Sequence, residues 1–184
     1  MKAPGTGVER KGKTLDRSHI VLVGMMGSGK SSVGRTLASR LERPLFDSDE
    51  MVEERVGRTI REIWEFDGEP AFRELETQTL LDSLERDEPS VIATGGGVVL
   101  SGRNRQLLID SDAHVVWLML DIELLLDRVR NGVHRPLLDD DPETKLRQMS
   151  QDREPLYREV ADAMVSVDNR SVVDVAKAVV RCCG

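Results

Sequence analysis

Residues 24–31 form the feature that most limits what this chain can fold into. They read Gly-Met-Met-Gly-Ser-Gly-Lys-Ser, which matches the phosphate-loop pattern G-x-x-x-x-G-K-[ST]. The apolar run Ile20–Val23 precedes the motif and a helical pattern over Lys30–Glu42 follows it, so the motif has the strand-to-helix setting that it requires. Such a loop directs backbone N–H groups and a helix N-terminus at phosphate oxygens. We therefore predict a site for a nucleoside triphosphate.

Two side chains of this loop have further roles in phosphate chemistry. Lys30 can reach the β- and γ-phosphates, and the Ser31 hydroxyl can ligate Mg²⁺. The ATP contacts predicted from this segment are Gly27, Ser28, Gly29, Lys30, Ser31 and Ser32. The alternative is a glycine-rich turn that merely joins a strand to a helix, which the match at every motif position disfavours.

Short apolar strands alternate with helical patterns along the chain. Strands are predicted at 20–23, 44–46, 90–93, 114–120 and 163–167. Helices are predicted at 30–42, within 50–86, and at 104–109, 121–129, 142–160 and from 171 onward. A capping box starts a new helix at Thr59, Pro70 marks a boundary near Gly68, and Pro155 is expected to kink its helix. The alternation predicts an α/β fold in three layers, a five-stranded parallel sheet between helices, with ligands at the carboxyl ends of the strands.

Length, charge and cysteine content limit the class of protein. A chain of 184 residues is about one domain, which we place at 18–184, with residues 1–17 as a flexible polar extension. There are 26 Lys+Arg against 33 Asp+Glu, a net charge of −7, which argues against nucleic acid or a membrane surface as a partner. No apolar run approaches the ~20 residues of a membrane span, and the N-terminus is unlike a signal peptide. Cys182 and Cys183 are the only cysteines, which is typical of a reduced, cytoplasmic protein.

The scarcity of lysine narrows the kind of phosphate-loop protein. Lys30 is the single lysine between Lys13 and Lys145, so the N-K-x-D guanine-binding motif of GTPases has no match after the phosphate loop. One small domain also leaves little room for the apparatus of an oligomeric ATPase. A kinase that acts on a small molecule or a nucleotide is therefore favoured.

Asp47-Ser48-Asp49 ends the second predicted strand. If the strand geometry persists, positions two apart face the same side and both carboxylates point into one site. One could then support Mg²⁺, and the other could orient or deprotonate an attacking hydroxyl. The alternative is a surface turn with a helix cap before Glu50, because Asp and Ser favour such places.

Two further segments are candidates for ligand binding, one because of its charged residues and one because of its glycines. Arg73 and Glu76 are three residues apart in a helical pattern, so the carboxylate can hold the guanidinium with its fork toward a ligand. The alternative is an exposed ion pair, which is common and contributes little. The run 95–97 is three consecutive glycines after a predicted strand, which suggests close backbone approach to a ligand, unless it is simply a loose loop.

Together these segments resemble one family, shikimate kinase, over about residues 20–170. The resemblance rests on six segments in order: GMMGSGKSSVG at 24–34, FDSD at 46–49, DGE…FRELE at 67–76, ATGGGVV at 93–99, HRPLL at 134–138 and REPLYREVA at 153–161. It implies a nucleoside monophosphate kinase-like fold with a mobile lid and a helical substrate-binding region. The implied activity is transfer of the γ-phosphoryl of ATP to the 3-hydroxyl of shikimate, in the chorismate and aromatic amino-acid pathway, usually by a monomer.

On the substrate side, the resemblance implies a role for each matching residue. Asp49 would contact the ring hydroxyls as the catalytic base, while Arg73 and Arg153 would hold the shikimate carboxylate and Glu76 would orient Arg73. Gly96 would donate its backbone N–H to the substrate. The substrate-binding region would span about 47–76, and its remaining predicted contacts are Gly95, Gly97 and Trp64. For Trp64 the alternative is a helix aromatic that faces the core.

On the nucleotide side, the resemblance implies that Asp47 supports Mg²⁺ through water, beside Ser31. Arg135, in a lid at about 130–141, would approach the transferring phosphates as a catalytic residue. Arg128 and Arg170 are the nearest matches for the adenine contacts. A lid would exclude water, because ATP would otherwise be hydrolysed.

Two other functions stay open at this point. Another small-molecule kinase of the same fold, such as a gluconate or nucleotide kinase, would share the phosphate loop and lid. A non-catalytic ATP-binding regulator would keep the fold without turnover, although the retained Asp47, Asp49, Arg73, Arg135 and Arg153 argue against lost catalysis.

Overall fold

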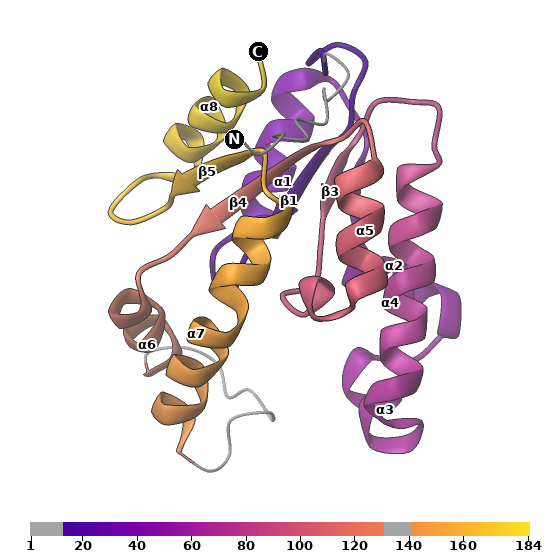
Figure 1. Cartoon of the computed structure of the whole chain (residues 1–184), viewed down its shortest axis with the longest axis vertical. Helices are drawn as coiled ribbons and strands as arrows, with labels where there is room; N and C mark the ends of the chain where they lie inside the picture. The colour runs from indigo at the N-terminus through magenta and orange to yellow at the C-terminus, as the bar shows by residue number, and fades with distance from the viewer. Residues whose placement is uncertain (1–12, 131–140) are drawn as a thin grey trace, which may run out of the picture.

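The computed structural model describes residues 13–130 and 141–184, and for residues 128–130 and 142 it describes the backbone only. Five parallel strands form its central sheet in the order β2-β3-β1-β4-β5 (Figure 1). The strands are β1 Ile20–Val23, β2 Leu45–Asp47, β3 Val91–Ala93, β4 His114–Met119 and β5 Ala163–Ser166. The predicted α/β fold is therefore confirmed.

The central position of β1 explains its composition. All four of its residues are fully buried, because β3 and β4 flank it in the sheet and helices cover both of its faces. A parallel strand in that position reads as a continuous apolar run rather than as an alternating one. The phosphate loop leaves the carboxyl end of this strand, so the motif is anchored at the buried centre of the sheet.

Helices cover the two faces of the sheet (Figure 1). α1 Lys30–Leu41 and α8 Val172–Cys183 pack on one face, against alternate β1 residues such as Ile20 and Leu22. The other face packs against α4 Gly68–Leu84, α5 Gly102–Asp110 and α7 Pro142–Val160. The remaining elements are α2 Ser48–Val56, α3 Ile60–Phe66, η1 Val98–Leu100 and α6 Ile122–Arg130.

A small third cluster lies outside the two that cover the faces of the sheet. Val52, Ile63 and Phe72 join α2, α3 and the start of α4, and partly buried neighbours pack around them. The capping box predicted at Thr59 is present: its hydroxyl accepts from the Glu62 backbone N–H, and the Glu62 carboxylate accepts from the Thr59 backbone N–H. This cluster holds the start of α4, which carries Arg73, beside the sheet.

Some details differ from the sequence-based expectations. The helix over 142–160 contains Pro155 within one element, and the kink expected there stays a prediction. Residues 13–17, expected in a flexible extension, include a docked segment: Lys13 donates to Asp162 at 2.7 Å, and the Leu15 side chain packs on the α1–α8 core. No helix in the described part of the chain is long and apolar enough to cross a membrane.

Candidate active site

The phosphate loop joins β1 to α1 at the carboxyl edge of the sheet. Gly24 has a φ of 145°, and a Cβ there would lie 2.6 Å from the Leu118 carbonyl oxygen, so only glycine fits this close approach to β4. Gly29 caps α1 in the left-handed region. The buried Lys30 ammonium donates to the carbonyl oxygens of Gly24 at 2.8 Å and Met25 at 3.0 Å. The lysine is therefore held within the loop where phosphates are expected.

Asp47 connects the phosphate loop to the end of β2. The Ser31 hydroxyl donates to its Oδ2 at 2.6 Å, and its Oδ1 accepts from the Asp49 backbone N–H at 3.2 Å. The second contact makes Asp47 the N-cap of α2. The helix cap in the alternative is therefore present at Asp47, but the surface turn is not, because Asp47 and Ser48 are buried. The same carboxylate also lies beside Ser31.

Asp49 does not continue the strand. It lies in the first turn of α2, so the expectation that both carboxylates share one face of a strand is wrong. Burial away from water raises the Asp49 pKa above its ordinary value, and the negative charge of Asp47 raises it further. The positive charges of Lys30 and Arg73 oppose this shift. Asp49 still belongs to the same group of charges, although its backbone is helical.

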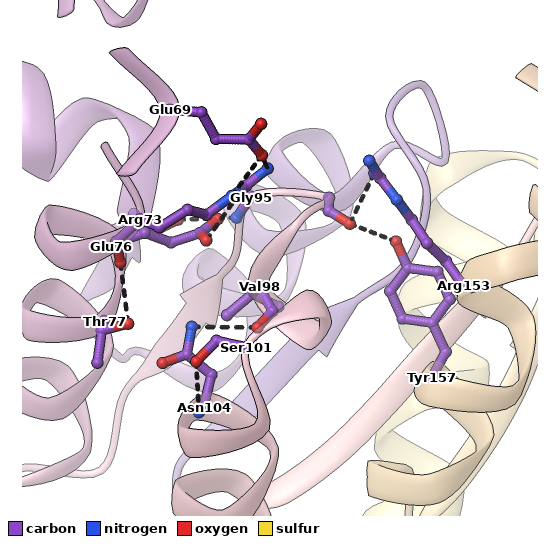
Figure 2. A network of polar contacts seen from close by, with 12 residues as sticks. Glu69, Arg73, Glu76, Thr77, Gly95, Val98, Ser101, Asn104, Arg153 and Tyr157 are labelled. Carbon is purple, nitrogen blue, oxygen red and sulfur yellow. Dashed lines mark hydrogen bonds and ion pairs between the residues drawn. The ribbon is translucent and has the colours of Figure 1, made fainter. Parts of the chain in front are cut away.

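Arg73, on α4, is held by two carboxylates. Its Nη1 donates to Glu76 at 2.9 Å, and its Nη2 donates to Glu69 at 3.0 Å (Figure 2). The Glu76 side chain is 1% exposed, so the interpretation of this pair as a surface contact is wrong. Burial raises the Glu76 pKa, and the Arg73 charge opposes that rise. The predicted orientation of Arg73 by Glu76 therefore has a structural basis.

The glycine run 95–97 passes between these charged groups. A Cβ at Gly95 would lie 2.8 Å from Glu76 Oε1 and 3.0 Å from Asp49 Oδ1, and one at Gly97 would lie 2.2 Å from Arg73 Nη1. A side chain at Gly97 would therefore displace the guanidinium. The loose-loop alternative is wrong, because the Gly95 N–H also donates to the Ser48 hydroxyl at 2.8 Å.

Arg153 lies across the glycine run from Arg73 (Figure 2). It comes from α7, it is 8% exposed, and its Nη1 donates to the Gly96 carbonyl oxygen at 3.2 Å. The Tyr157 hydroxyl donates to the same oxygen at 2.5 Å. Two arginines far apart in the sequence are thus brought to the two sides of one loop.

Trp64 packs as the core-facing alternative predicts, and it also lies beside Arg73. It is half-buried against Phe72, with ring centroids 5.6 Å apart, as a core-facing aromatic would be. The Arg73 guanidinium also lies 5.5 Å from the Trp64 ring and 5.2 Å from the Phe72 ring, a cation–π arrangement. Trp64 therefore forms part of the surroundings of Arg73.

Of the arginines predicted for the adenine and lid contacts, only Arg170 has a described side chain. Arg170 is exposed in the loop after β5 and donates to the Ser166 carbonyl oxygen at 3.2 Å. Arg128 lies in α6, but its side chain is outside the description, and Arg135 with most of the predicted lid lies outside the described residues. Their roles stay predictions.

Ser48 and Tyr157 contact the glycine run but were not predicted from the sequence as site residues. Ser48 stands between the two aspartates. Tyr157 is one helical turn after Arg153, a spacing that places the side chains of Arg153 and Tyr157 on one face of α7. That spacing is the signal that could have found Tyr157. The contacts with Gly95 and Gly96 depend on the tertiary fold.

Comparison with known proteins assigns the chain to a family. The family model described as shikimate kinase matches residues 26–183. The chain belongs to the shikimate kinase family. The shikimate kinase of Dechloromonas aromatica is 48% identical over 150 residues, which cover 81% of each protein.

Solved structures of the shikimate kinase family have the same fold. The enzyme of Acinetobacter baumannii in complex with shikimate has a TM-score of 0.83 at 40% identity, covering 90% of this chain and 92% of its own. A gluconokinase of Sinorhizobium meliloti covers 91% of this chain and 92% of its own, with a TM-score of 0.54 at 18% identity. At that identity the likeness extends to the fold alone.

Proposed function

We propose that the chain transfers the γ-phosphoryl group of ATP to the 3-hydroxyl of shikimate, giving shikimate 3-phosphate and ADP in the chorismate pathway. The observation that carries this is the meeting of Asp49, Arg73 and Arg153 around the glycine run, beside the phosphate loop. Shikimate is a small carboxylate with three hydroxyls. Guanidinium forks suit a carboxylate, and the carboxylate of Asp49 suits a hydroxyl.

Asp49 is the proposed base. As the shikimate 3-hydroxyl oxygen forms its bond to the γ-phosphorus, the bond from that phosphorus to the β,γ-bridging oxygen breaks and ADP leaves. The hydroxyl proton passes to Asp49, whose raised pKa suits a proton acceptor better than an ordinary aspartate would. Lys30 compensates charge on the transferring group, and Arg135 is proposed to do so from the lid.

The family implies Mg²⁺, and the residues present fit it. Ser31 and Asp47 place a hydroxyl and a carboxylate 2.6 Å apart at the phosphate loop, and hard oxygen ligands of this kind suit Mg²⁺. When bound, Mg²⁺ would offset phosphate charge. Within residues 13–130 and 141–184, no group of three or more His, Cys, Asp or Glu side chains could hold a metal. We therefore propose that phosphate oxygens and water complete its shell.

Several further roles are proposed from the family resemblance or the sequence. Gly27, Ser28, Gly29 and Ser32 are proposed to contact the phosphates, and Arg128 and Arg170 the adenine. Gly96 is proposed to donate its N–H to shikimate, with Trp64 as one wall of the pocket. We also propose that the protein is a monomer, as the family resemblance implies, and that it is cytoplasmic, with which its two cysteines at 182–183 are consistent.

A coupled ADP-release assay with shikimate, Mg²⁺ and ATP tests the activity. Gluconate and nucleoside monophosphates serve as competing substrates in the same assay. Turnover of one of these with shikimate inert would replace the proposal by another small-molecule kinase. ATP binding without turnover on any of them would favour a regulator.

We expect Arg153→Ala to raise the KM for shikimate by about 10–100-fold, because a charged hydrogen bond to the carboxylate is lost. The KM for ATP should change little. Arg158→Ala is the matched control: Arg158 lies on the same helix, is exposed, and pairs with Glu154 at 3.0 Å. A larger rise in the KM for ATP than for shikimate would move Arg153 to the nucleotide side.

A further inference from the structure

The Gly96 carbonyl oxygen accepts two hydrogen bonds from α7. Tyr157 Oη donates at 2.5 Å and Arg153 Nη1 at 3.2 Å (Figure 2). A carbonyl oxygen has two lone pairs, so each donor can take one. The hydroxyl contact lies at the short end of the O–H···O range, whereas the guanidinium contact lies at the long end of the N–H···O range. Tyr157 is therefore the main partner of this carbonyl, and Arg153 shares it.

The position of the Tyr157 hydroxyl is tightly constrained. The residue is 1% exposed, and its ring stacks on Trp117 with centroids 5.7 Å apart. Burial raises its pKa to about 12, so the hydroxyl remains a donor throughout the neutral range. A rigid, permanently protonated donor can hold one backbone oxygen in one place.

Gly96 is also where the glycine run meets the phosphate loop. A Cβ at Gly96 would lie 3.1 Å from the Met26 backbone nitrogen and 3.4 Å from the Gly24 carbonyl oxygen. On the preceding residue, the Gly95 N–H is held by Ser48 of α2. A rotation of the Gly96 peptide would thus disturb the contacts of the glycine run with the phosphate loop and with Ser48 of α2.

We propose that Tyr157 is a positioning residue for the phosphoryl acceptor: by occupying one lone pair of the Gly96 carbonyl, it holds the glycine run and leaves the Arg153 fork available to the substrate carboxylate. This rests on the proposed function. Without the hydroxyl, a half-buried carbonyl loses a partner, and Arg153, which already donates to it, is the nearest replacement. Donors of Arg153 would then turn toward the protein rather than toward the ligand.

The variant Tyr157→Phe tests this, because it keeps the ring on Trp117 and removes only the hydroxyl. We expect the KM for shikimate to rise about 5–10-fold, the scale of one buried hydrogen bond, with the KM for ATP within about twofold. Ser83→Ala is the matched control: it deletes a buried hydroxyl that donates to the Thr79 carbonyl oxygen at 2.7 Å, away from the glycine run. A KM for shikimate that is unchanged in Tyr157→Phe, with a loss of Tm like that of Ser83→Ala, would overturn the proposal.

A double-mutant cycle with Arg153→Lys tests whether Tyr157 affects shikimate binding through Arg153. If Tyr157 acts through the guanidinium fork, Tyr157→Phe should raise the KM for shikimate much less in the Arg153→Lys background than in the wild type. Equal fold-changes in the two backgrounds would contradict the role assigned to Arg153. Wild-type turnover in the same assay separates the two hypotheses: an inert wild type rejects the proposed function, whereas an active wild type with an unaffected Tyr157→Phe rejects only the positioning role.

Discussion

Asp49→Asn is expected to lower kcat by about 10²–10⁴-fold, the usual contribution of a positioned general base. Asparagine keeps the size of the side chain but cannot accept the proton of the shikimate hydroxyl. ATP affinity should be unchanged, because Asp49 lies on α2 rather than in the phosphate loop. Turnover by ADP release and ATP affinity by calorimetry are the measurements, and near-normal turnover would rule out an essential base.

Glu50→Gln is the matched control for Asp49→Asn. Glu50 is the next residue of the same helix turn, but it is exposed and pairs with Arg35 at 3.0 Å, so its loss should leave kcat unchanged. Thermal stability gives a second readout. Because the folded protein raises the Asp49 pKa, the ionised carboxylate opposes folding, and this cost is present above the folded-state pKa. Asp49→Asn should therefore have a Tm at neutral pH no lower than that of the wild type.

The raised pKa of Asp49 also predicts how kcat depends on pH. A base works when it is deprotonated, so kcat should fall as the pH drops through the Asp49 pKa. Burial and the Asp47 charge raise that pKa, so the acid limb should lie above the ordinary aspartate value of about 3.9. A limb at or below that value in the wild type would contradict the assignment.

Lys30→Ala is expected to lower kcat by about 10²–10³-fold, the usual cost of removing one preorganised group that stabilises transition-state charge. The KM for ATP should change less, because the backbone N–H groups of the loop remain. The Lys30 ammonium already lies in the loop, on the carbonyl oxygens of Gly24 and Met25. ADP release measures the effect, and unchanged turnover would contradict the phosphate-loop role.

Lys177→Ala controls for the general loss of a positive charge. Lys177 lies on α8, about half exposed, and its ammonium is 3.6 Å from Asp174. Its removal changes the net charge of the protein as Lys30→Ala does, yet it should leave kcat and both KM values unchanged. An equal loss of turnover in the two variants would point to overall charge rather than to the loop.

The acidity of the chain does not prevent the binding of anions. The net charge is −7, but Lys30, Arg73 and Arg153 converge on the groups around the glycine run and the phosphate loop. A local group of cations sets the potential of a cleft, whereas the total charge mainly affects extended partners. The proposed roles would account for the scarcity of lysine: arginine suits a carboxylate, and the one lysine of the long middle segment is the one proposed to serve the phosphates.

Local signals were enough for most of the fold. The five predicted strands are confirmed with small shifts at their ends. For β1, β3 and β4 the signal is a run of buried apolar residues rich in β-branched side chains, which is distinctive. The edge strands β2 and β5 are only partly buried. The capping box at Thr59 is confirmed because both of its partners lie within four residues. The errors concern boundaries: the chain after Asp47 turns at once into α2, because the Asp47 side chain caps that helix.

By itself, the sequence determined the phosphate loop, the alternating α/β architecture and the residue types of a kinase that binds a carboxylate. These are carried by contiguous motifs or by helical spacing, so they can be read without knowing the fold. Only the tertiary structure decided that Ser48 and Tyr157 hold the glycine run, and that Arg73 and Arg153 lie on its two sides. The Tyr157–Gly96 contact joins residues 61 positions apart, and such contacts follow from the packing of α7 on the sheet, which no local pattern specifies.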